Sequence, residues 1–340
     1  MNILYVKSLP LKDVIADLAK ELGTVYSKNC DLYTVEIPDT YGTGQILGAD
    51  FGNGFGMLNY NCLFREPLMV LFKFNQVHPV KFLHCFQGSF QHQFTDKEKR
   101  QEVNQYQNII IASSQNNGHI LYFEAGKEVK IFSIEIDRNN FQEEVACISK
   151  VYNDDIVQLL RDNKAEKNFY HEGNYSLIVS KLINEIHSFD KTDILEKFFY
   201  KAKSYEILVN QWSQYFDDIE HGGKGYLLRR VDLDRFQSIT DYIKNNIGAS
   251  LSIDDLEAEF ELSEHKLQSL FKEVSHTTIN AYIKEERLQH AIHLMKSDEY
   301  NMSEIVYAIG LSSKSYFSKI FKERFDISPS VYAKRLKENI

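Results

Sequence analysis

One stretch decides the fold of the C-terminal part of the chain: Asn301-Met-Ser-Glu304-Ile305-Val-Tyr-Ala308-Ile309-Gly310-Leu311-Ser312-Ser-Lys-Ser-Tyr316-Phe317-Ser-Lys-Ile320-Phe321-Lys322. Apolar residues recur three or four positions apart on both sides of Gly310, which is typical of two amphipathic helices. Asn301 and Glu304 are spaced as a capping box for the first helix. Gly310 can adopt the left-handed conformation that ends it, and Ser312 is expected to cap the second helix. The stretch is therefore predicted to be a helix-turn-helix.

The same pattern occurs earlier, in Ser252-Ile-Asp-Asp-Leu256-Glu-Ala-Glu-Phe260-Glu-Leu262-Ser263-Glu-His-Lys-Leu267-Gln-Ser-Leu270-Phe271-Lys272. Ser252 and Asp255 form its capping box, and Ser263 is expected to cap its second helix. Thr278–Lys296 lies between the two copies and has the apolar spacing of one helix of about 28 Å. Successive major-groove faces of DNA repeat at roughly 34 Å, so this helix has a suitable length to hold two DNA-reading helices on one side of a duplex.

The residues that point outward from the second helix of each copy are short, polar or basic, which suits the base edges of a major groove. They are Glu264, His265, Gln268 and Ser269 in the first copy, and Lys314, Ser315, Ser318 and Lys319 in the second. The net charge of −9 argues against a protein that coats nucleic acid nonspecifically. Basic residues nevertheless outnumber acidic ones from Ser312 to the C-terminus.

These residues resemble the AraC/XylS family of bacterial transcription regulators. The resemblance rests on Leu262-Ser263, Leu270-Phe271-Lys272, Arg287-Leu288-x-x-Ala291, Ile305-x-x-x-x-Gly310-Leu311, Ser315-Tyr316-Phe317-Ser318, Phe321-Lys322 and Ser328-Pro329-x-x-Tyr332. It implies a regulator that binds promoter DNA through both copies. The base-contacting residues would then be the outward residues of both helices, with the helix caps Ser263 and Ser312 and the nearby Lys322 on phosphates.

The first copy departs from the family pattern in its charge. Glu261 occupies a turn position that often holds Gly, Asn or His, and acidic residues crowd the motif: Asp254, Asp255, Glu257, Glu259 and Glu264. Acidic side chains weaken the attraction to phosphates on which DNA affinity depends. We therefore predict that the second copy supplies more of the affinity for DNA. The alternative is that the first copy reads a narrower set of DNA sequences.

The N-terminal half changes to a β pattern, in which short runs rich in β-branched and aromatic residues alternate with turns such as Gly52-Asn-Gly54. About eight such strands predict an antiparallel sandwich, a cupin-like jelly roll. The runs are Leu32–Ile37, Gly44–Phe51, Phe55–Asn61, Leu68–Asn75, Lys81–Phe86, Asn108–Ala112, His119–Phe123 and Val129–Ile136. Residues 11–23 and the segment from Phe141 to about Glu220 have helical spacing instead.

We therefore expect an α+β multidomain protein. Its parts would be a β-rich, cupin-like sensor domain (1–137), a helical coupling or dimerisation region with a linker (138–230), and an AraC-type DNA-binding domain with two helix-turn-helix motifs (231–340). The glycine-rich His221–Gly225 is expected to be the loop before the third part. The helix Asp193–Asp217 has a wider apolar surface than one packing seam needs, so one part of it can pack on the sandwich and another can form the dimer contact that the family resemblance implies.

The sensor half is weakly similar to the pyochelin-regulator-like subgroup, in Phe82-Leu-His84-Cys-Phe86-Gln-Gly88-Ser-Phe90, Gln107-Asn-Ile-Ile, Tyr122-Phe-Glu-Ala-Gly126 and Leu195–Leu208. The similarity implies that a small-molecule effector binds here, without naming it. Candidate pocket residues are Phe82, His84, Phe86 and Tyr122. The alternative is that these side chains belong to the core.

Two other classes remain open. One is a cupin-type metalloenzyme fused to a DNA-binding module, but catalytic cupins use a His-x-His pair, and His84, His92 and His119 are isolated in the sequence. No G-x-S-x-G, H-E-x-x-H or phosphate-binding glycine loop occurs either, so we expect no enzyme, metal or cofactor. The other is a constitutive DNA-binding regulator whose N-terminal domain only dimerises.

The four cysteines, Cys30, Cys62, Cys85 and Cys147, have no C-x-x-C spacing and are expected to be reduced core residues of a cytoplasmic protein. No run of eighteen apolar residues occurs, and the N-terminus lacks the pattern of a secretory signal. The expected partners are double-stranded promoter DNA, a small-molecule effector, a second copy of the chain and, for an activator, RNA polymerase.

Overall fold

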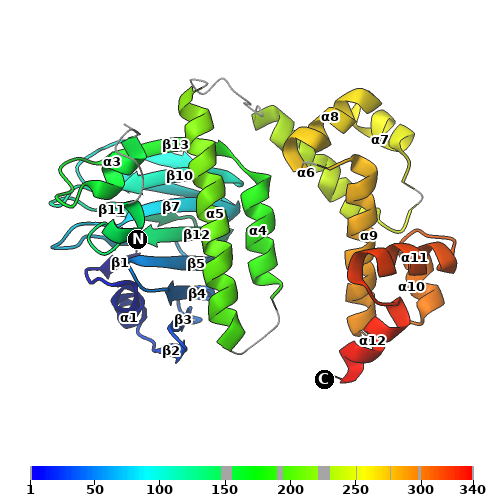
Figure 1. Ribbon diagram of the computed structural model, residues 1–340, viewed down its shortest axis with the longest axis horizontal. Helices are drawn as coiled ribbons and strands as arrows, with labels where there is room; N and C mark the ends of the chain where they lie inside the picture. The colour runs from blue at the N-terminus through cyan, green and yellow to red at the C-terminus, as the bar shows by residue number, and fades with distance from the viewer. Residues whose placement is uncertain are drawn as a thin grey trace. The chain divides into compact units, whose positions relative to one another are not determined.

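The computed structural model describes residues 2–146, 155–189, 194–220, 230–249, 251–275, 277–297 and 300–338. Two compact units make up the chain: unit 1 is Met1–Leu227 and unit 2 is Leu228–Ile340 (Figure 1). The helices that follow residue 138 pack in unit 1. The expected glycine-rich loop at 221–225 and Cys147 lie outside the described residues.

Unit 1 is built on two sheets, whose strands are antiparallel except for the parallel pair β1 and β6. Sheet A has the order β1 (Asn2–Val6), β6 (Leu68–Phe72), β11 (His119–Phe123), β8 (Phe90–Phe94) and β9 (Gln101–Val103). Sheet B has the order β13 (Phe169–Tyr175), β10 (Gln107–Ala112), β7 (Val80–Gln87), β12 (Glu128–Ile136), β5 (Phe55–Phe64), β4 (Gly42–Asp50), β3 (Leu32–Glu36) and β2 (Tyr26–Asn29).

Two apolar layers follow from the alternation of side chains along these strands. One lies between the sheets and includes Leu83 and Ile131. The other lies on the opposite face of sheet B and includes Phe82 and Phe132. Helices cover this second face, as Figure 1 shows for α4 (Leu177–His187) and α5 (Ile194–Glu220). The predicted jelly roll with flanking helices is confirmed.

The structure corrects several sequence-based expectations for unit 1. The described ranges contain thirteen strands rather than about eight. One of them, β13, lies within the segment that was expected to be helical and pairs with β10. Its Gly173 allows close approach, because a Cβ there would lie 2.9 Å from the carbonyl oxygen of Asn108. Cys62 and Cys85 are buried as expected, but Cys30 is exposed.

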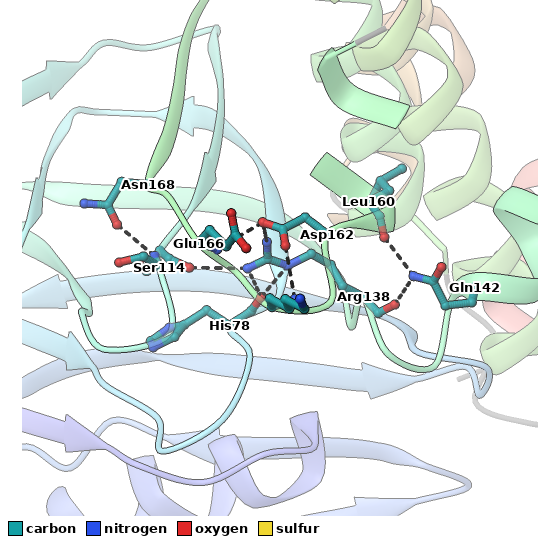
Figure 2. Close-up of polar contacts among 10 residues, drawn as sticks. His78, Ser114, Arg138, Gln142, Leu160, Asp162, Glu166 and Asn168 are labelled. Atoms are coloured by element: carbon teal, nitrogen blue, oxygen red, sulfur yellow. Dashed lines mark hydrogen bonds and ion pairs between the residues drawn. The ribbon is translucent and has the colours of Figure 1, made fainter. Parts of the chain in front are cut away.

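A fully buried arginine, Arg138, ties together the segments at one end of the sandwich (Figure 2). Its Nε and Nη2 donate to the carbonyl oxygen of His78 at 3.0 and 2.8 Å, and Nη2 also reaches the carbonyl oxygen of Ser113 at 3.3 Å. Its Nη1 lies 3.7 Å from a carboxylate oxygen of Asp162, which follows α3 (Asp155–Arg161). One side chain therefore links three connecting segments.

Unit 2 is helical: α6 (Arg230–Asn245), α7 (Ile253–Phe260), α8 (Glu264–Ser275), α9 (Ile279–Ser297), α10 (Met302–Ala308), α11 (Lys314–Phe325) and α12 (Pro329–Glu338). The expected connecting helix is α9. Its N-terminal half contributes Tyr282, whose ring packs on Phe271 of α8 with centroids 5.4 Å apart. Its C-terminal half contributes Leu288 and Met295 to a cluster with α10 and α11. Since α9 packs on both motifs, it is apolar on more than one side.

No helix within the described residues is both long and apolar enough to cross a membrane.

Candidate nucleic-acid interface

The first helix-turn-helix consists of α7, a tight turn and α8. The capping box is confirmed: the Ser252 hydroxyl accepts from the Asp255 amide at 3.1 Å, and the Asp255 carboxylate accepts from the Ser252 amide at 2.9 Å. The Ser252 hydroxyl, which also donates to the Asp255 carboxylate at 2.6 Å, and the Ser252 amide together lower the pKa of Asp255. Glu261 adopts the left-handed conformation that ends α7, with φ 51° and ψ 39°. That conformation suits glycine, which explains why a glutamate there departs from the family pattern.

Helix α8 begins after Ser263, whose hydroxyl accepts from the Lys266 amide at 3.4 Å. The predicted stripe of Leu267, Leu270 and Phe271 is buried, as expected. Of the predicted base-contacting residues, Glu264 and His265 are exposed, whereas Gln268 and Ser269 are half-buried.

The second helix-turn-helix consists of α10, its turn and α11. Its capping box is also confirmed, with the Asn301 side chain accepting from the Glu304 amide at 3.1 Å and the Glu304 carboxylate accepting from the Asn301 amide at 2.8 Å. Gly310 has φ 73°, as predicted. A Cβ there would lie 2.7 Å from the carbonyl oxygen of Ala249, so the position needs glycine for space as well as for conformation.

The cap of α11 is one residue later than predicted. The hydroxyl of Ser313, and not that of Ser312, accepts a hydrogen bond from the Tyr316 amide at 3.2 Å. An N-cap side chain reaches the amide two or three positions on, and α11 starts at Lys314, so Ser312 falls outside the cap. Ser312 is nonetheless exposed beside the helix.

Helix α11 presents a continuous polar and basic face. All of its predicted DNA-contacting residues are exposed: Lys314, Ser315, Ser318, Lys319 and Lys322. Sequence reasoning did not count Tyr316 among them, although its side chain is 50% exposed on the same helix. Its place in the quoted motif beside Ser315 was the available signal. The predicted core residues Phe317, Ile320 and Phe321 are buried behind this face.

The second helices of the two motifs, α8 and α11, are called the recognition helices. They differ at their N-termini, where exposed amides and the helix dipole favour the binding of phosphate. At α8, a carboxylate oxygen of Glu257 accepts the amide hydrogen of Glu264. A negative charge of the protein therefore lies where a phosphate would bind. At α11, the cap is the neutral Ser313 hydroxyl, and Lys314 follows it.

Two arginines in unit 2 have structural contacts. Arg324 pairs with Glu285 of α9, with 3.0 Å between Nε and Oε2. Arg287 of α9 donates to the carbonyl oxygen of Ala249 at 3.0 Å, and burial lowers its pKa. Both contacts join elements within unit 2, so the exposed lysines of α11 are the better candidates for phosphate contacts.

The four candidate effector residues of unit 1 do not line one cavity. Phe82, His84 and Phe86 alternate along β7 and face the helices; Phe82 lies 6.5 Å from Trp212 of α5, centroid to centroid. Tyr122 lies on β11 in the other sheet, where the guanidinium of Arg100 stacks 4.0 Å from its ring centre.

His84 joins sheet B to the helices. Its Nδ1 pairs with the Asn108 side-chain oxygen at 2.7 Å, and its Nε2 with the Ser180 hydroxyl of α4 at 2.6 Å. Gln211 of α5 donates to the same Asn108 oxygen at 3.0 Å. Burial lowers the pKa of His84 to about 4, so it is neutral in this network at pH 7.

Histidines that are isolated in the sequence gather between the sheets. The ring of His119 lies 5.7 Å from His92 and 6.5 Å from His78, centroid to centroid. Burial lowers the pKa of each, for His78 and His92 to about 4. In the part of the chain that the structure describes, no group of three or more His, Cys, Asp or Glu residues is arranged to hold a metal ion.

Comparisons with known proteins identify the C-terminal unit. A family model described as "Helix-turn-helix domain" matches residues 256–335. Regulatory protein SoxS of Salmonella typhimurium is 32% identical over 100 residues, which are 29% of this chain and 94% of SoxS. The Msm operon regulatory protein of Streptococcus mutans is 23% identical over 188 residues, which are 53% of this chain and 64% of that protein.

Further matches differ in how much of the chain they cover. The uncharacterized HTH-type transcriptional regulator YijO of Escherichia coli is 29% identical over 100 residues, and the match spans 29% of this chain and 35% of YijO. A solved structure of ToxT from Vibrio cholerae covers 82% of this chain and 98% of its own, at 17% identity and a TM-score of 0.29. Because SoxS is matched over nearly its whole length, the chain belongs to the AraC/XylS family of transcription regulators, with the family's domain in unit 2.

Proposed function

We propose that this protein is a sequence-specific DNA-binding regulator of transcription, located with promoter DNA in the cytoplasm. The observation that carries the proposal is the exposed face of α11, whose other side is buried in unit 2. This face carries Lys314, Ser315, Ser318 and Lys319. Such a face can enter a major groove, and its side chains can donate to base edges and phosphates.

Both recognition helices contribute to the affinity for DNA, but to different extents. The exposed lysines of α11 neutralise phosphates, while the N-terminus of α8 already holds the carboxylate of Glu257. Since phosphate contacts provide much of the affinity for DNA, α11 supplies the larger share. On this proposal α8 adds specificity through His265 and Gln268 more than affinity.

Selection of DNA from a random pool by the purified full chain tests the proposal. We expect enrichment of two short boxes whose centres lie about ten base pairs apart, the spacing of one helical turn. Replacing Lys314 and Lys319 by alanine should weaken binding and reduce the slope of log K against log salt by about 0.9 for each phosphate that is no longer neutralised. The matched control replaces Lys97 and Lys99, two exposed lysines of unit 1. No enrichment, or equal losses of affinity in the control, would refute the proposal.

We also infer that the protein forms a homodimer through α5. From Phe198 onward, positions spaced alternately three and four apart carry apolar side chains, the heptad spacing of a coiled coil. The stripe includes Phe198 and Val209, both 62% exposed, Phe216 at 41% and Ile219 at 57%. Tyr205 and Trp212 of this stripe are half-buried against unit 1, whereas its exposed members are available to a second copy.

The mass of the full chain in solution, measured by light scattering, tests this inference. Val209→Glu together with Phe216→Glu should convert a dimer to a monomer, because a charge in an apolar seam is costly to bury. Val25→Glu is the matched control, since Val25 is 83% exposed and lies outside α5. A wild-type monomer at all concentrations, or a dimer that survives both α5 substitutions, would exclude this interface.

For unit 1 we propose an effector-sensing role. The support is its jelly roll together with the polar network of His84, Asn108 and Gln211, which fastens α5 to sheet B. An effector that changes this packing would shift the population of DNA-competent arrangements. Footprints of the selected DNA with and without a bound ligand should then differ, and identical protection with a ligand that demonstrably binds would contradict the role.

A further inference from the structure

Unit 1 contains a half-open cavity of about 680 Å³ that none of the sequence motifs indicated. It lies between the start of α1 (Leu11–Glu21), the β4–β5 turn and the segment that follows β12. This volume is typical of sites that bind small organic molecules. The segments around it are far apart in the sequence, which is why no single motif pointed to it.

The lining combines an apolar floor with carboxylates. The apolar residues of the lining are Leu9, Pro10, Leu11, Val14, Phe55 and Pro79, although the Phe55 ring packs on the opposite face of sheet B, against Tyr205 of α5. The carboxylates are Asp50, Glu135, Asp137 and Glu143. No lysine or arginine is among the lining residues, so the charged side chains of the lining are all acidic.

The carboxylates differ in how they are neutralised. Glu135, at the floor, is 8% exposed and pairs with Lys81, with 2.8 Å between Oε2 and Nζ. Asp50 and Asp137 accept only nearby backbone and amide hydrogens, such as the Gly52 amide at 2.9 Å. Among the described residues, Asp50, Asp137 and Glu143 form no ion pair with a lysine or arginine. No salt bridge among the described residues therefore neutralises these three carboxylates, although Asp137 interacts electrostatically with its neighbour Arg138.

The wall that carries Asp137 is held in place from behind. Figure 2 shows Arg138 linking the chain to His78 and Asp162, and Gln142 donating to the carbonyl oxygens of Arg138 and Leu160. The Arg138 guanidinium is buried and does not line the cavity. The lining is thus largely fixed before a ligand arrives, which lowers the entropic cost of binding.

Two glycines of the lining let neighbouring segments of the chain approach closely. A Cβ at Gly54 would lie 2.8 Å from the carbonyl oxygen of Asp137, and a Cβ at Gly56 would lie 2.9 Å from Leu11 Cδ1. The described ranges contain no group of three or more His, Cys, Asp or Glu residues that could hold a metal ion, so the carboxylates of the cavity do not form a metal site. Carboxylates beside an apolar surface match an organic cation better than a metal ion.

We propose that this cavity binds a small organic ammonium compound, with its cationic nitrogen among Asp50, Asp137 and Glu143 and its apolar body on Leu11 and Val14. The site itself is argued from the cavity alone. Its use as the effector site rests on the sensing role proposed above.

Calorimetric titration of the full chain with three matched probes tests the proposal: hexylammonium, 1-hexanol and hexanoate. Hexylammonium should bind at least about tenfold more tightly than either of the others, because only it gains the attraction of the carboxylates. High salt should weaken its binding and leave that of hexanol unchanged. Equal affinities for the three probes, or salt-independent binding of hexylammonium, would overturn the proposal without any variant being made.

A double substitution locates the site. Asp50→Asn with Glu143→Gln removes two charges and keeps an oxygen that can accept the Gly52 amide, so the affinity for hexylammonium should fall about tenfold. Asp39→Asn with Glu66→Gln changes the same charge at exposed positions outside the lining and should have no effect. An unchanged affinity in the first variant, or an equal loss in the second, places the ammonium elsewhere. None of these measurements uses DNA, so they stand or fall separately from the regulatory role.

Discussion

Acid should unfold unit 1 because three of its buried histidines must be neutral in the folded state. Burial lowers the pKa of His78, His84 and His92 to about 4, from an ordinary value of 6.5. Lys81 faces His78 and His92, and Arg138 faces His78, so nearby positive charge adds to the effect of burial. Partners that favour the charged form, such as the Asn108 side chain at His84, offset only part of it.

The sign and size of the effect follow from the difference in bound protons. Between pH 6.5 and 4 the unfolded chain binds a proton at each histidine and the folded chain does not, so the free energy of unfolding falls as the pH falls. Above pH 6.5 these histidines are neutral in both states, so the free energy of unfolding has its full value. A shift of one pKa unit corresponds to about 1.4 kcal/mol, so each histidine costs about 2 kcal/mol at pH 5 and about 3 kcal/mol near pH 4. Together these losses are comparable to the whole stability of a domain.

The assay uses Trp212, the only tryptophan in the sequence, which lies on α5 against Phe82 of sheet B. Its fluorescence therefore reports the unfolding of unit 1 and not of unit 2. We expect urea midpoints to fall steeply between pH 6.5 and 5, and His92→Gln to make that dependence shallower. His265→Gln, an exposed histidine of unit 2, is the control. A urea midpoint that stays constant from pH 7 to 5 would refute the argument.

Three further outcomes follow from single side chains. Glu261→Gly should stabilise unit 2 by about 1 kcal/mol in thermal unfolding followed by circular dichroism, because the glutamate is held in a left-handed conformation; a lower melting temperature would contradict this. Gly310→Ala should destabilise the same unit by at least about 2 kcal/mol, since its Cβ would meet the Ala249 carbonyl oxygen at 2.7 Å; a neutral effect would show that the turn can move. Arg138→Ala should cost unit 1 about 3–5 kcal/mol by the Trp212 signal, because it leaves buried carbonyls such as that of His78 without their donor; a loss below 1 kcal/mol would mean that water replaces the guanidinium.

The sequence predicted unit 2 closely because its signals are local. Capping boxes, the glycine turn and the apolar stripes all act within a few residues, so Ser252, Asn301 and Gly310 lie where the pattern placed them. The one error, Ser312 for Ser313 as the cap of α11, was a choice between two adjacent serines. Either serine has the required hydroxyl, and only the first helical residue decides between them.

Unit 1 was less predictable because its decisive contacts join distant segments. Strand β13 shows no clear alternation of apolar residues and exists through its pairing with β10. The histidines between the sheets come from β8, β11 and the segment before β7, so their spacing in the sequence did not predict that their rings lie close together. The predicted effector residues lie on two strands, with Phe82, His84 and Phe86 on β7 and Tyr122 on β11, whereas the proposed ammonium cavity is lined by separate segments between Leu9 and Glu143.

The most direct test of the account compares the two recognition helices on one DNA. Fluorescence anisotropy with the selected duplex would measure the affinity of the full chain carrying His265→Ala and Gln268→Ala on α8, and of the chain carrying Lys314→Ala and Lys319→Ala on α11. Both variants should bind more weakly than the wild type, and the α11 variant should lose at least about tenfold more affinity, because it gives up phosphate contacts as well as base contacts. Equal losses from the two helices would contradict the uneven division of affinity, and no loss from either would contradict the interface itself.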